Sequence, residues 1–188
     1  MNNRRAFIVG IKSINLLKNE IRFLKKYKPW GIILFTRNIK DINQTTELTK
    51  SIRKIFNDDK YPILIDQEGG KVSRLENIIT SKNLSSEFFG KKYLKNVSKF
   101  KVYYKLFIDK SSNLLKQMGI NLNSVPVLDL KIKGSSNIIG NRSYSNKPSI
   151  VSKIGDFCIK NFHENSIGTI IKHIPGHGLA KVDSHYSS

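Results

Sequence analysis

The residues best suited to chemistry lie near the C-terminal end of the chain, where three of its four histidines occur together. His173 follows Lys172 directly, His177 comes four residues after His173, and Asp183 stands two residues before His185. An imidazole titrates near neutral pH and can therefore both donate and accept a proton there. Residues two apart in extended backbone point to the same side, so Asp183 can orient the His185 ring and raise its basicity. The spacing predicts proton transfer by this pair.

The same histidines could instead bind a metal ion, because imidazole is a common ligand of zinc. Two histidines spaced four apart serve this purpose when one helix carries both on the same face. Here Pro175 and Gly176 stand between His173 and His177 and break any such helix. The sequence therefore favours acid–base chemistry over a metal site, and we expect no cofactor.

Further charged side chains follow apolar segments elsewhere in the chain. Asp66 and Glu68 come directly after one apolar run, and Asp129 ends another. Arg74 and Arg142 stand in the loops that follow. The loops after parallel strands converge on one face of an α/β barrel, where carboxylates and cations can hydrogen-bond a polyhydroxylated ligand from several directions. Taken alone, Asp129 has a simpler interpretation as an Asx-turn residue, and Arg142 as a donor that pins its own loop.

Patterns of buried strands and amphipathic helices alternate along the whole chain. The predicted strands cover residues 6–11, 30–35, 61–65, 120–130 and 167–171, and the predicted helices cover 14–27, 42–56, 99–118 and 148–165. Residues 75–97 mix polar and aromatic types and predict a loop with short helical pieces. Continuous apolar strands without hairpin turns are typical of a parallel sheet with helical crossovers.

Five such units fit two α/β architectures, which the strand patterns alone do not separate. One is a doubly wound sheet, although no Gly-x-Gly-x-x-Gly follows the first strand as its dinucleotide-binding form requires. The other is a TIM-like (β/α)8 barrel, which usually takes about 250 residues, so that only about the first five βα units would be present. We expect residues 1–188 to form one domain.

Composition restricts the class of protein. A hydrophobic content of 39% and an aromatic content of 10% indicate a globular chain. The single cysteine, Cys158, excludes an internal disulfide and is typical of a reducing compartment. The apolar run at 6–11 is too short for a signal peptide, and no run approaches the roughly 20 apolar residues that span a bilayer. We therefore expect a cytoplasmic protein without a membrane segment.

The charge of the chain is unusual, since 33 Lys and Arg against 14 Asp and Glu give a net charge of +19. Such an excess is compatible with a polyanionic partner such as nucleic acid. However, the lysines are scattered rather than gathered in one run, and arginine, which reads base edges best, is scarce. The sequence disfavours a nucleic-acid partner.

Four segments of the chain resemble the signatures of one known family. They are 65–75 (IDQEGGKVSRL), 123–130 (NSVPVLDL), 140–145 (GNRSYS) and 172–185 (KHIPGHG, then DSH). In order and spacing they resemble the N-terminal domain of glycoside hydrolase family 3, most of all its bacterial β-N-acetylhexosaminidases of peptidoglycan recycling. The last of the four segments is the most specific, and the resemblance covers nearly the whole chain.

The resemblance implies a TIM-like barrel and a glycosidase that retains anomeric configuration through a glycosyl-enzyme intermediate. It implies that His185 is the general acid/base with Asp183 as its partner, and that Glu68 has a structural role. The residues implied to bind the non-reducing N-acetylglucosamine (GlcNAc) are Asp66, Arg74, Arg142, Lys172 and His173. The implied substrates are GlcNAc-anhydroMurNAc peptides. The resemblance implies no metal ion, no nucleic-acid partner and no membrane association. It also implies that the complete enzyme is a monomer.

The resemblance also implies that part of the family's domain is missing. The family's aspartate nucleophile follows a later strand, and neither Asp66 nor Asp129 fits that role. We therefore expect a truncated chain or a fragment that lacks the nucleophile and about three barrel strands. The alternatives are a β-glucosidase-type member of the family, a non-catalytic sugar-binding remnant, and a basic nucleic-acid-binding domain.

Overall fold

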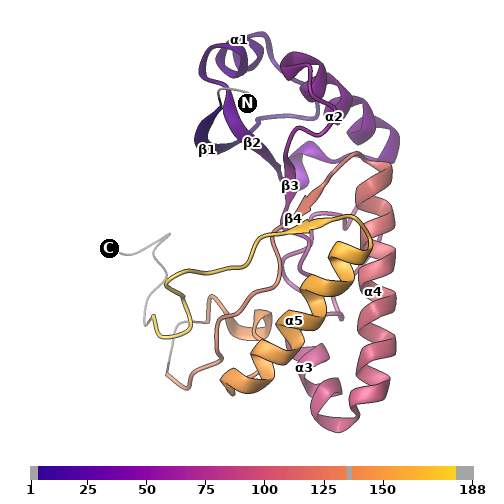
Figure 1. Ribbon diagram of the computed structural model, residues 1–188, viewed down its shortest axis with the longest axis vertical. Helices are drawn as coiled ribbons and strands as arrows, with labels where there is room; N and C mark the ends of the chain where they lie inside the picture. The colour runs from indigo at the N-terminus through magenta and orange to yellow at the C-terminus, as the bar shows by residue number, and fades with distance from the viewer. Residues whose placement is uncertain (1–3, 135–136, 181–188) are drawn as a thin grey trace.

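A computed structural model describes residues 4–134 and 137–180 of the chain (Figure 1). Five parallel strands form one sheet, and their order in the sheet, β1-β2-β3-β4-β5, is also their order along the chain. The strands are β1 (Arg5–Gly10), β2 (Pro29–Leu34), β3 (Ile63–Ile65), β4 (Leu122–Asn123) and β5 (Gly168–Thr169). A doubly wound sheet reverses its order at a switch point. The sequential order therefore corresponds to consecutive units of a barrel, and the doubly wound alternative is wrong.

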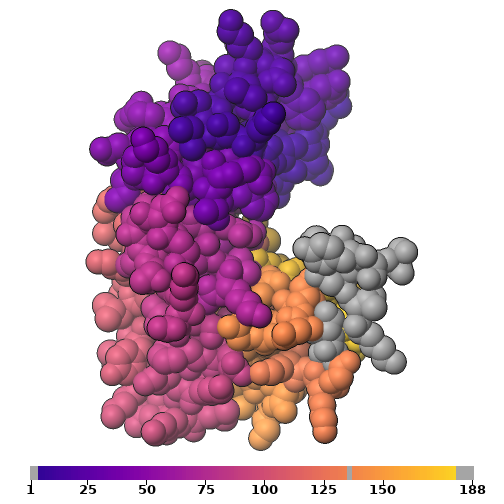
Figure 2. Space-filling view, turned by 180° about the vertical axis from the view of Figure 1, so that it is seen from behind, coloured from indigo at the N-terminus to yellow at the C-terminus, as the bar shows by residue number. Residues whose placement is uncertain are grey.

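Helices connect the successive strands. They are α1 (Lys18–Tyr27), α2 (Ile42–Phe56), α3 (Ser86–Lys95), α4 (Val97–Gln117) and α5 (Pro148–Glu164), with short 3₁₀ turns at η1 (Thr36–Asn38) and η2 (Gly140–Arg142). In Figure 1 the long helices α2 and α4 stand along the right side, and the segment after β5 extends to the left. Seen from behind, the N-terminal units occupy the top, α3 and α4 the lower left, and the segments after β4 the lower right (Figure 2). No helix in the described parts of the chain is both long and apolar enough to cross a bilayer.

Several helix ends follow from the sequence. Asp41 precedes α2, and its carboxylate accepts a hydrogen bond from the backbone N–H of Gln44, 2.8 Å away, as an N-cap does. Pro148 opens α5 at the first helical position, and Gly119 follows α4 with φ +69°. The three helices agree, to within about two residues at each end, with those predicted at 42–56, 99–118 and 148–165.

The first helix begins later than predicted, at Lys18 rather than at residue 14. The carbonyl of Ile14, which a helix beginning there would use internally, accepts a hydrogen bond from the Gln44 side chain at 2.6 Å. The Asn38 side chain likewise donates to the carbonyl of Ser13 at 2.9 Å. Side chains from the next βα unit therefore hold this segment in a turn.

Two further segments differ from the prediction. Residues 75–97 contain a regular helix, α3, which Ser85 caps by accepting from the N–H of Phe88 at 3.2 Å. The fourth strand is two residues long rather than extending to residue 130, because Pro126 has no N–H to donate to a ladder. In the described part of the chain, an isolated bridge between Val127 and Lys172 continues the pairing of β4 with β5.

The core lies between the sheet and its helices. Its fully buried members include Ile32, Ile63 and Ile65 from the strands and Ile52, Ile108, Leu115 and Ile154 from the helices. Side chains alternate along a strand, so Asp66, the residue after β3, turns away from Ile65 and from this core. The alternation thus sends the first charged residue after β3 to the face that the helices do not cover.

Gly69 and Gly134 provide a matched test of the loop that follows β3. Both have a positive φ, +85° and +83°, but a Cβ on Gly69 would meet the Leu84 carbonyl oxygen at 2.3 Å, whereas a Cβ on Gly134 would meet nothing within 4 Å. The left-handed conformation alone costs an L residue about 1–2 kcal/mol. We expect Gly69→Ala to lower the free energy of unfolding in urea by about 3 kcal/mol or more and Gly134→Ala by about 1 kcal/mol. Equal losses would show that the backbone clash is absent.

Candidate functional site

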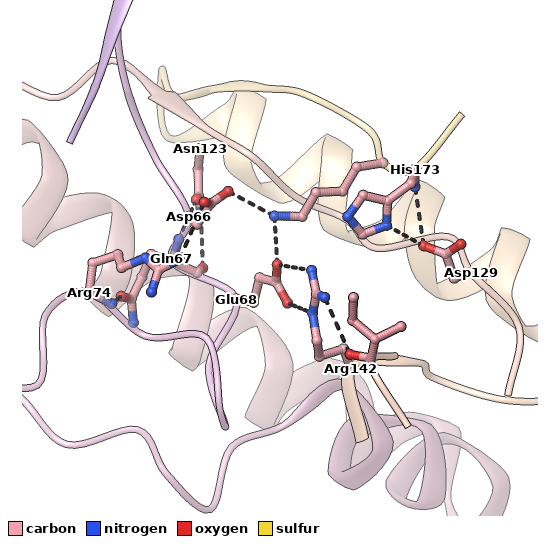
Figure 3. Close-up of polar contacts among 10 residues, drawn as sticks. Asp66, Gln67, Glu68, Arg74, Asn123, Asp129, Arg142 and His173 are labelled. Carbon is pink, nitrogen blue, oxygen red and sulfur yellow. Dashed lines mark hydrogen bonds and ion pairs between the residues drawn. The ribbon is translucent and has the colours of Figure 1, made fainter. Parts of the chain in front are cut away.

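Charged side chains from three separate loops meet beyond the carboxyl ends of the strands (Figure 3). Asp66 and Glu68 follow β3, Arg142 ends η2, and Lys172 stands shortly after β5. Lys172 and Asp66 are 106 residues apart in sequence, yet the Lys172 Nζ lies 2.8 Å from Asp66 Oδ1. The sequential order of the sheet brings these loops together, because the carboxyl ends of its parallel strands share one face.

Glu68 forms the centre of this cluster. Its two carboxylate oxygens accept a bidentate pair of hydrogen bonds from Arg142, with Nε–Oε2 and Nη2–Oε1 distances of 2.9 Å each. The Lys172 ammonium lies 2.5 Å from Oε1 of the same carboxylate. Burial lowers the pKa of Arg142, but the hydrogen bond and the charge of Glu68 outweigh it, and the net shift is upward. Arg142 is thereby held in its charged form.

Asp66 is held by Lys172 and, more loosely, by Arg74. The Arg74 Nη2 lies 3.6 Å from Asp66 Oδ2, and the Arg74 guanidinium stands 5.5 Å from the centre of the Phe35 ring. Burial raises the pKa of Asp66, whereas Lys172 and Arg74 lower it by more, so the pKa lies below its ordinary value. Asp66 is therefore an anionic acceptor at neutral pH, with two cationic donors beside it.

A second cluster forms around Asp129, whose side chain is 1% exposed. Its carboxylate accepts from the His173 ring at 2.5 Å and from the His173 backbone N–H at 3.2 Å. It also accepts from the backbone N–H groups of His177 at 2.5 Å and Gly178 at 3.1 Å. The bonds span more than 40 residues of sequence, so the Asx-turn interpretation of Asp129 is wrong. Asp129 instead fixes the histidine-containing loop.

The ionisation of Asp129 follows from these contacts. Burial raises its pKa, but the hydrogen bonds from the His173 ring and the His177 backbone lower it by more, and the pKa lies below the ordinary value. The His173 and His177 rings stand edge to face with their centres 5.1 Å apart. Within residues 4–134 and 137–180, no three His, Cys, Asp or Glu side chains are arranged to hold a metal ion.

The structure brings together four of the predicted binding residues, namely Asp66, Arg74, Arg142 and Lys172. His173 is adjacent in sequence but bonds to Asp129 rather than to this cluster. The predicted catalytic pair, Asp183 and His185, lies outside the described residues.

Two amides that the sequence analysis did not consider support the site. The Gln67 Oε1 accepts from the backbone N–H of Arg74 at 2.9 Å and so shapes the loop that carries this arginine. The Asn123 side chain accepts from the Gln67 N–H and donates to the Gln67 carbonyl, both at 3.0 Å. Both amides are buried, and buried polar groups need hydrogen-bond partners. In the sequence, each is a polar residue inside an apolar strand or just after one, which is the signal that could have identified them.

Replacing Asp129 with asparagine tests its role in the loop. The amide NH2 cannot accept the N–H groups that face the carboxylate, so buried donors lose partners. We expect Asp129→Asn to lower the free energy of unfolding by about 2–4 kcal/mol in urea titrations at pH 7. Asp109→Asn is the control, because Asp109 also accepts from two side chains but stands on the exposed face of α4; its loss should stay below about 1 kcal/mol.

The pH dependence gives the same test a second measurement. Because folding lowers the pKa of Asp129, its ionised form stabilises the fold above about pH 4, and this contribution disappears as the pH falls through the folded-state pKa. Asp129→Asn removes the contribution at every pH. The unfolding free energy of the variant should therefore fall less between pH 5 and pH 2 than that of the wild type. A parallel pair of curves would contradict the role of the carboxylate.

The amino-acid sequence is similar to that of known glycosidases. Residues 8–188 match the model of the glycosyl hydrolase family 3 N-terminal domain. A beta-hexosaminidase of Thioalkalivibrio sulfidiphilus is 28% identical over 178 residues, which make up 95% of this chain and 50% of that protein. Beta-hexosaminidase A of Pseudoalteromonas piscicida is 31% identical over 86% of this chain and 27% of its own length. The chain thus spans half the length, or less, of these two curated relatives.

Solved structures show the same fold. NagZ from Neisseria gonorrhoeae, in complex with N-trifluoroacetyl-D-glucosamine, is 30% identical with a TM-score of 0.86, over 97% of this chain and 53% of that chain. A family 3 beta-N-acetylglucosaminidase from Paenibacillus is 28% identical with a TM-score of 0.80, over 95% of this chain and 33% of its own. The resemblance expected from the sequence motifs is confirmed: the described residues contain five consecutive parallel strands of a TIM-barrel-like N-terminal domain, and the chain belongs to glycosyl hydrolase family 3.

Proposed function

We propose that this chain is part of a β-N-acetylhexosaminidase that removes a terminal, non-reducing GlcNAc from peptidoglycan-derived muropeptides in the cytoplasm. The observation that carries the proposal is the cluster in which Lys172 joins Asp66 and Glu68 at the carboxyl ends of the strands. Its support from known proteins is the NagZ of Neisseria gonorrhoeae, whose structure contains a glucosamine derivative.

The chemistry of the cluster suits a sugar. Each sugar hydroxyl is both a donor and an acceptor, so a ring is best held by an anionic acceptor and cationic donors set side by side. Asp66 supplies the acceptor, and Lys172 and Arg74 stand beside it as donors. Arg142 and His173 complete the proposed set of sugar-binding residues. The side chains of Asp66, Lys172 and Arg74 are 16%, 13% and 26% exposed and can therefore reach a ligand.

We assign the proton transfers to His185, oriented by Asp183. In the first step His185 protonates the leaving oxygen as the glycosidic bond breaks and an aspartate outside this chain bonds to the anomeric carbon. In the second step His185 takes a proton from water, which displaces that aspartate and restores the configuration. A histidine in this role departs from the usual pair of carboxylates, but a neighbouring carboxylate orients an imidazole and stabilises its charged form.

Sugar binding can be measured on the chain directly. We expect the 188-residue chain to bind GlcNAc more tightly than glucose in NMR titrations. Asp66→Ala should weaken GlcNAc binding by about tenfold or more, because it removes the acceptor and leaves Lys172 and Arg74 less neutralised. Asp156→Ala, which breaks only an exposed ion pair with Lys160, is the control and should bind as the wild type does. Equal affinities for GlcNAc and glucose would place the chain with the β-glucosidase-type members of the family.

Catalysis can be measured on the protein purified from its native cell. We expect this protein to hydrolyse 4-nitrophenyl β-N-acetylglucosaminide faster than the corresponding glucoside. His185→Ala should lower kcat by about 10²–10⁴-fold, the usual contribution of a general acid/base. His163→Ala, a histidine on α5 whose ring contacts Thr169 at 3.0 Å, is the control and should retain activity. Sugar binding without hydrolysis in the wild type would instead favour a non-catalytic sugar-binding protein.

A further inference from the structure

Glu68 is the most deeply buried acid of the polar cluster. Its side chain is 2% exposed, compared with 16% for Asp66. Both of its oxygens already accept from cations: Oε2 from Arg142, and Oε1 from Arg142 and Lys172 together. A carboxylate in this state has little capacity left for a ligand. Glu68 therefore differs from Asp66, which is accessible and suited to direct contact with a sugar.

Glu68 joins two cations that come from different parts of the chain. Arg142 belongs to η2, after β4, and Lys172 follows β5. Both meet the single oxygen Oε1, at 2.9 Å and 2.5 Å. Two like charges this close repel each other strongly in a site with little water, unless an anion lies between them. Glu68 supplies that anion, and Figure 3 shows its carboxylate facing the Arg142 guanidinium.

The backbone holds Glu68 firmly in this place. Its N–H donates to the carbonyl of Val72 at 2.9 Å, and Gly69 bridges to the same residue. On its other side, Gln67 is bound at both its N–H and its carbonyl by the Asn123 side chain. A carboxylate fixed in this way can set the position of flexible cationic side chains, which otherwise adopt many rotamers.

We propose that Glu68 is a positioning residue, which places Arg142 and Lys172 at the spacing and orientation that the sugar requires without touching the sugar itself. This inference rests on the proposed function, because it assumes that these two cations contact GlcNAc. It replaces the purely structural role that the sequence resemblance implied. Stability alone does not explain the arrangement, since buried ion pairs usually contribute little net stability compared with apolar residues of the same size.

The test compares variants of the full 188-residue chain in two measurements. The first is the NMR signal of the Arg142 Nε–H group, assigned by its loss in Arg142→Lys. The second is GlcNAc affinity by NMR titration. We expect Glu68→Gln to move the Arg142 signal toward the position of a free arginine and to weaken GlcNAc binding by about tenfold or more. Glu87→Gln is the matched control, because Glu87 also pairs with two lysines, 91 and 131, but outside the site; neither measurement should change.

The outcomes separate this inference from the proposed function. A Glu68→Gln chain that folds and binds GlcNAc with wild-type affinity overturns the positioning role. If the wild type binds no GlcNAc, the proposed function fails, and the role of Glu68 in placing Arg142 is decided by the Nε–H signal alone: an unmoved signal overturns it.

A second variant, Glu68→Asp, keeps the inference testable when Glu68→Gln cannot be used. If Glu68→Gln does not fold, Glu68→Asp retains the charge but shortens the side chain by one methylene, so that it should hold one cation and not both. It should bind GlcNAc more weakly than the wild type while one of the two cationic groups remains fixed. If neither variant folds, the wild-type signal decides: an Arg142 Nε–H at the position of a free arginine overturns the proposal, and a displaced, slowly exchanging signal supports it.

Discussion

The site depends on the pairing of buried carboxylates with opposite charges or N–H donors. A carboxylate removed from water is strongly disfavoured unless it is paired, and both Glu68 and Asp129 have side chains that are almost wholly buried. Their partners are far away in sequence, 74 residues for Arg142 and 44 for His173. Such pairs form only if the loops after β3, β4 and β5 lie side by side. The electrostatic requirement and the strand order therefore support each other.

The charges of the main cluster do not balance. Three cations, Arg74, Arg142 and Lys172, surround two carboxylates, Asp66 and Glu68. This excess keeps Asp66 ionised, as its lowered pKa indicates. It also leaves cationic N–H groups available to a ligand that offers oxygen atoms. A neutral sugar with many hydroxyls can use both the anion and the remaining donors without bringing a further charge into the site.

Much of this arrangement could be predicted from the sequence. Periodicity located the strands and every helix except α3. The convergence of loops after parallel strands placed Asp66 and Arg142 on one face, and the family resemblance added Lys172. The strand order could not be obtained in this way, because five βα units have the same local patterns in a barrel and in a doubly wound sheet. The hydrogen-bond partner of the Asp129 carboxylate could not be predicted from the sequence either. An aspartate gives the same local signal in an Asx-turn and in a bond to a loop 44 residues away, and only the folded chain distinguishes them.

Lys172 and His173 link the two networks, because these adjacent residues bind different carboxylates. Lys172 bonds to Asp66 and Glu68, whereas His173 bonds to Asp129. The segment is therefore held at one end by the cluster around Glu68 and, through the N–H groups of His177 and Gly178, by Asp129 further along. In the sequence, the proposed acid–base pair of Asp183 and His185 follows this segment closely. The binding half and the proton-transfer half of the proposed mechanism are thus joined by one short segment, held in place by three carboxylates.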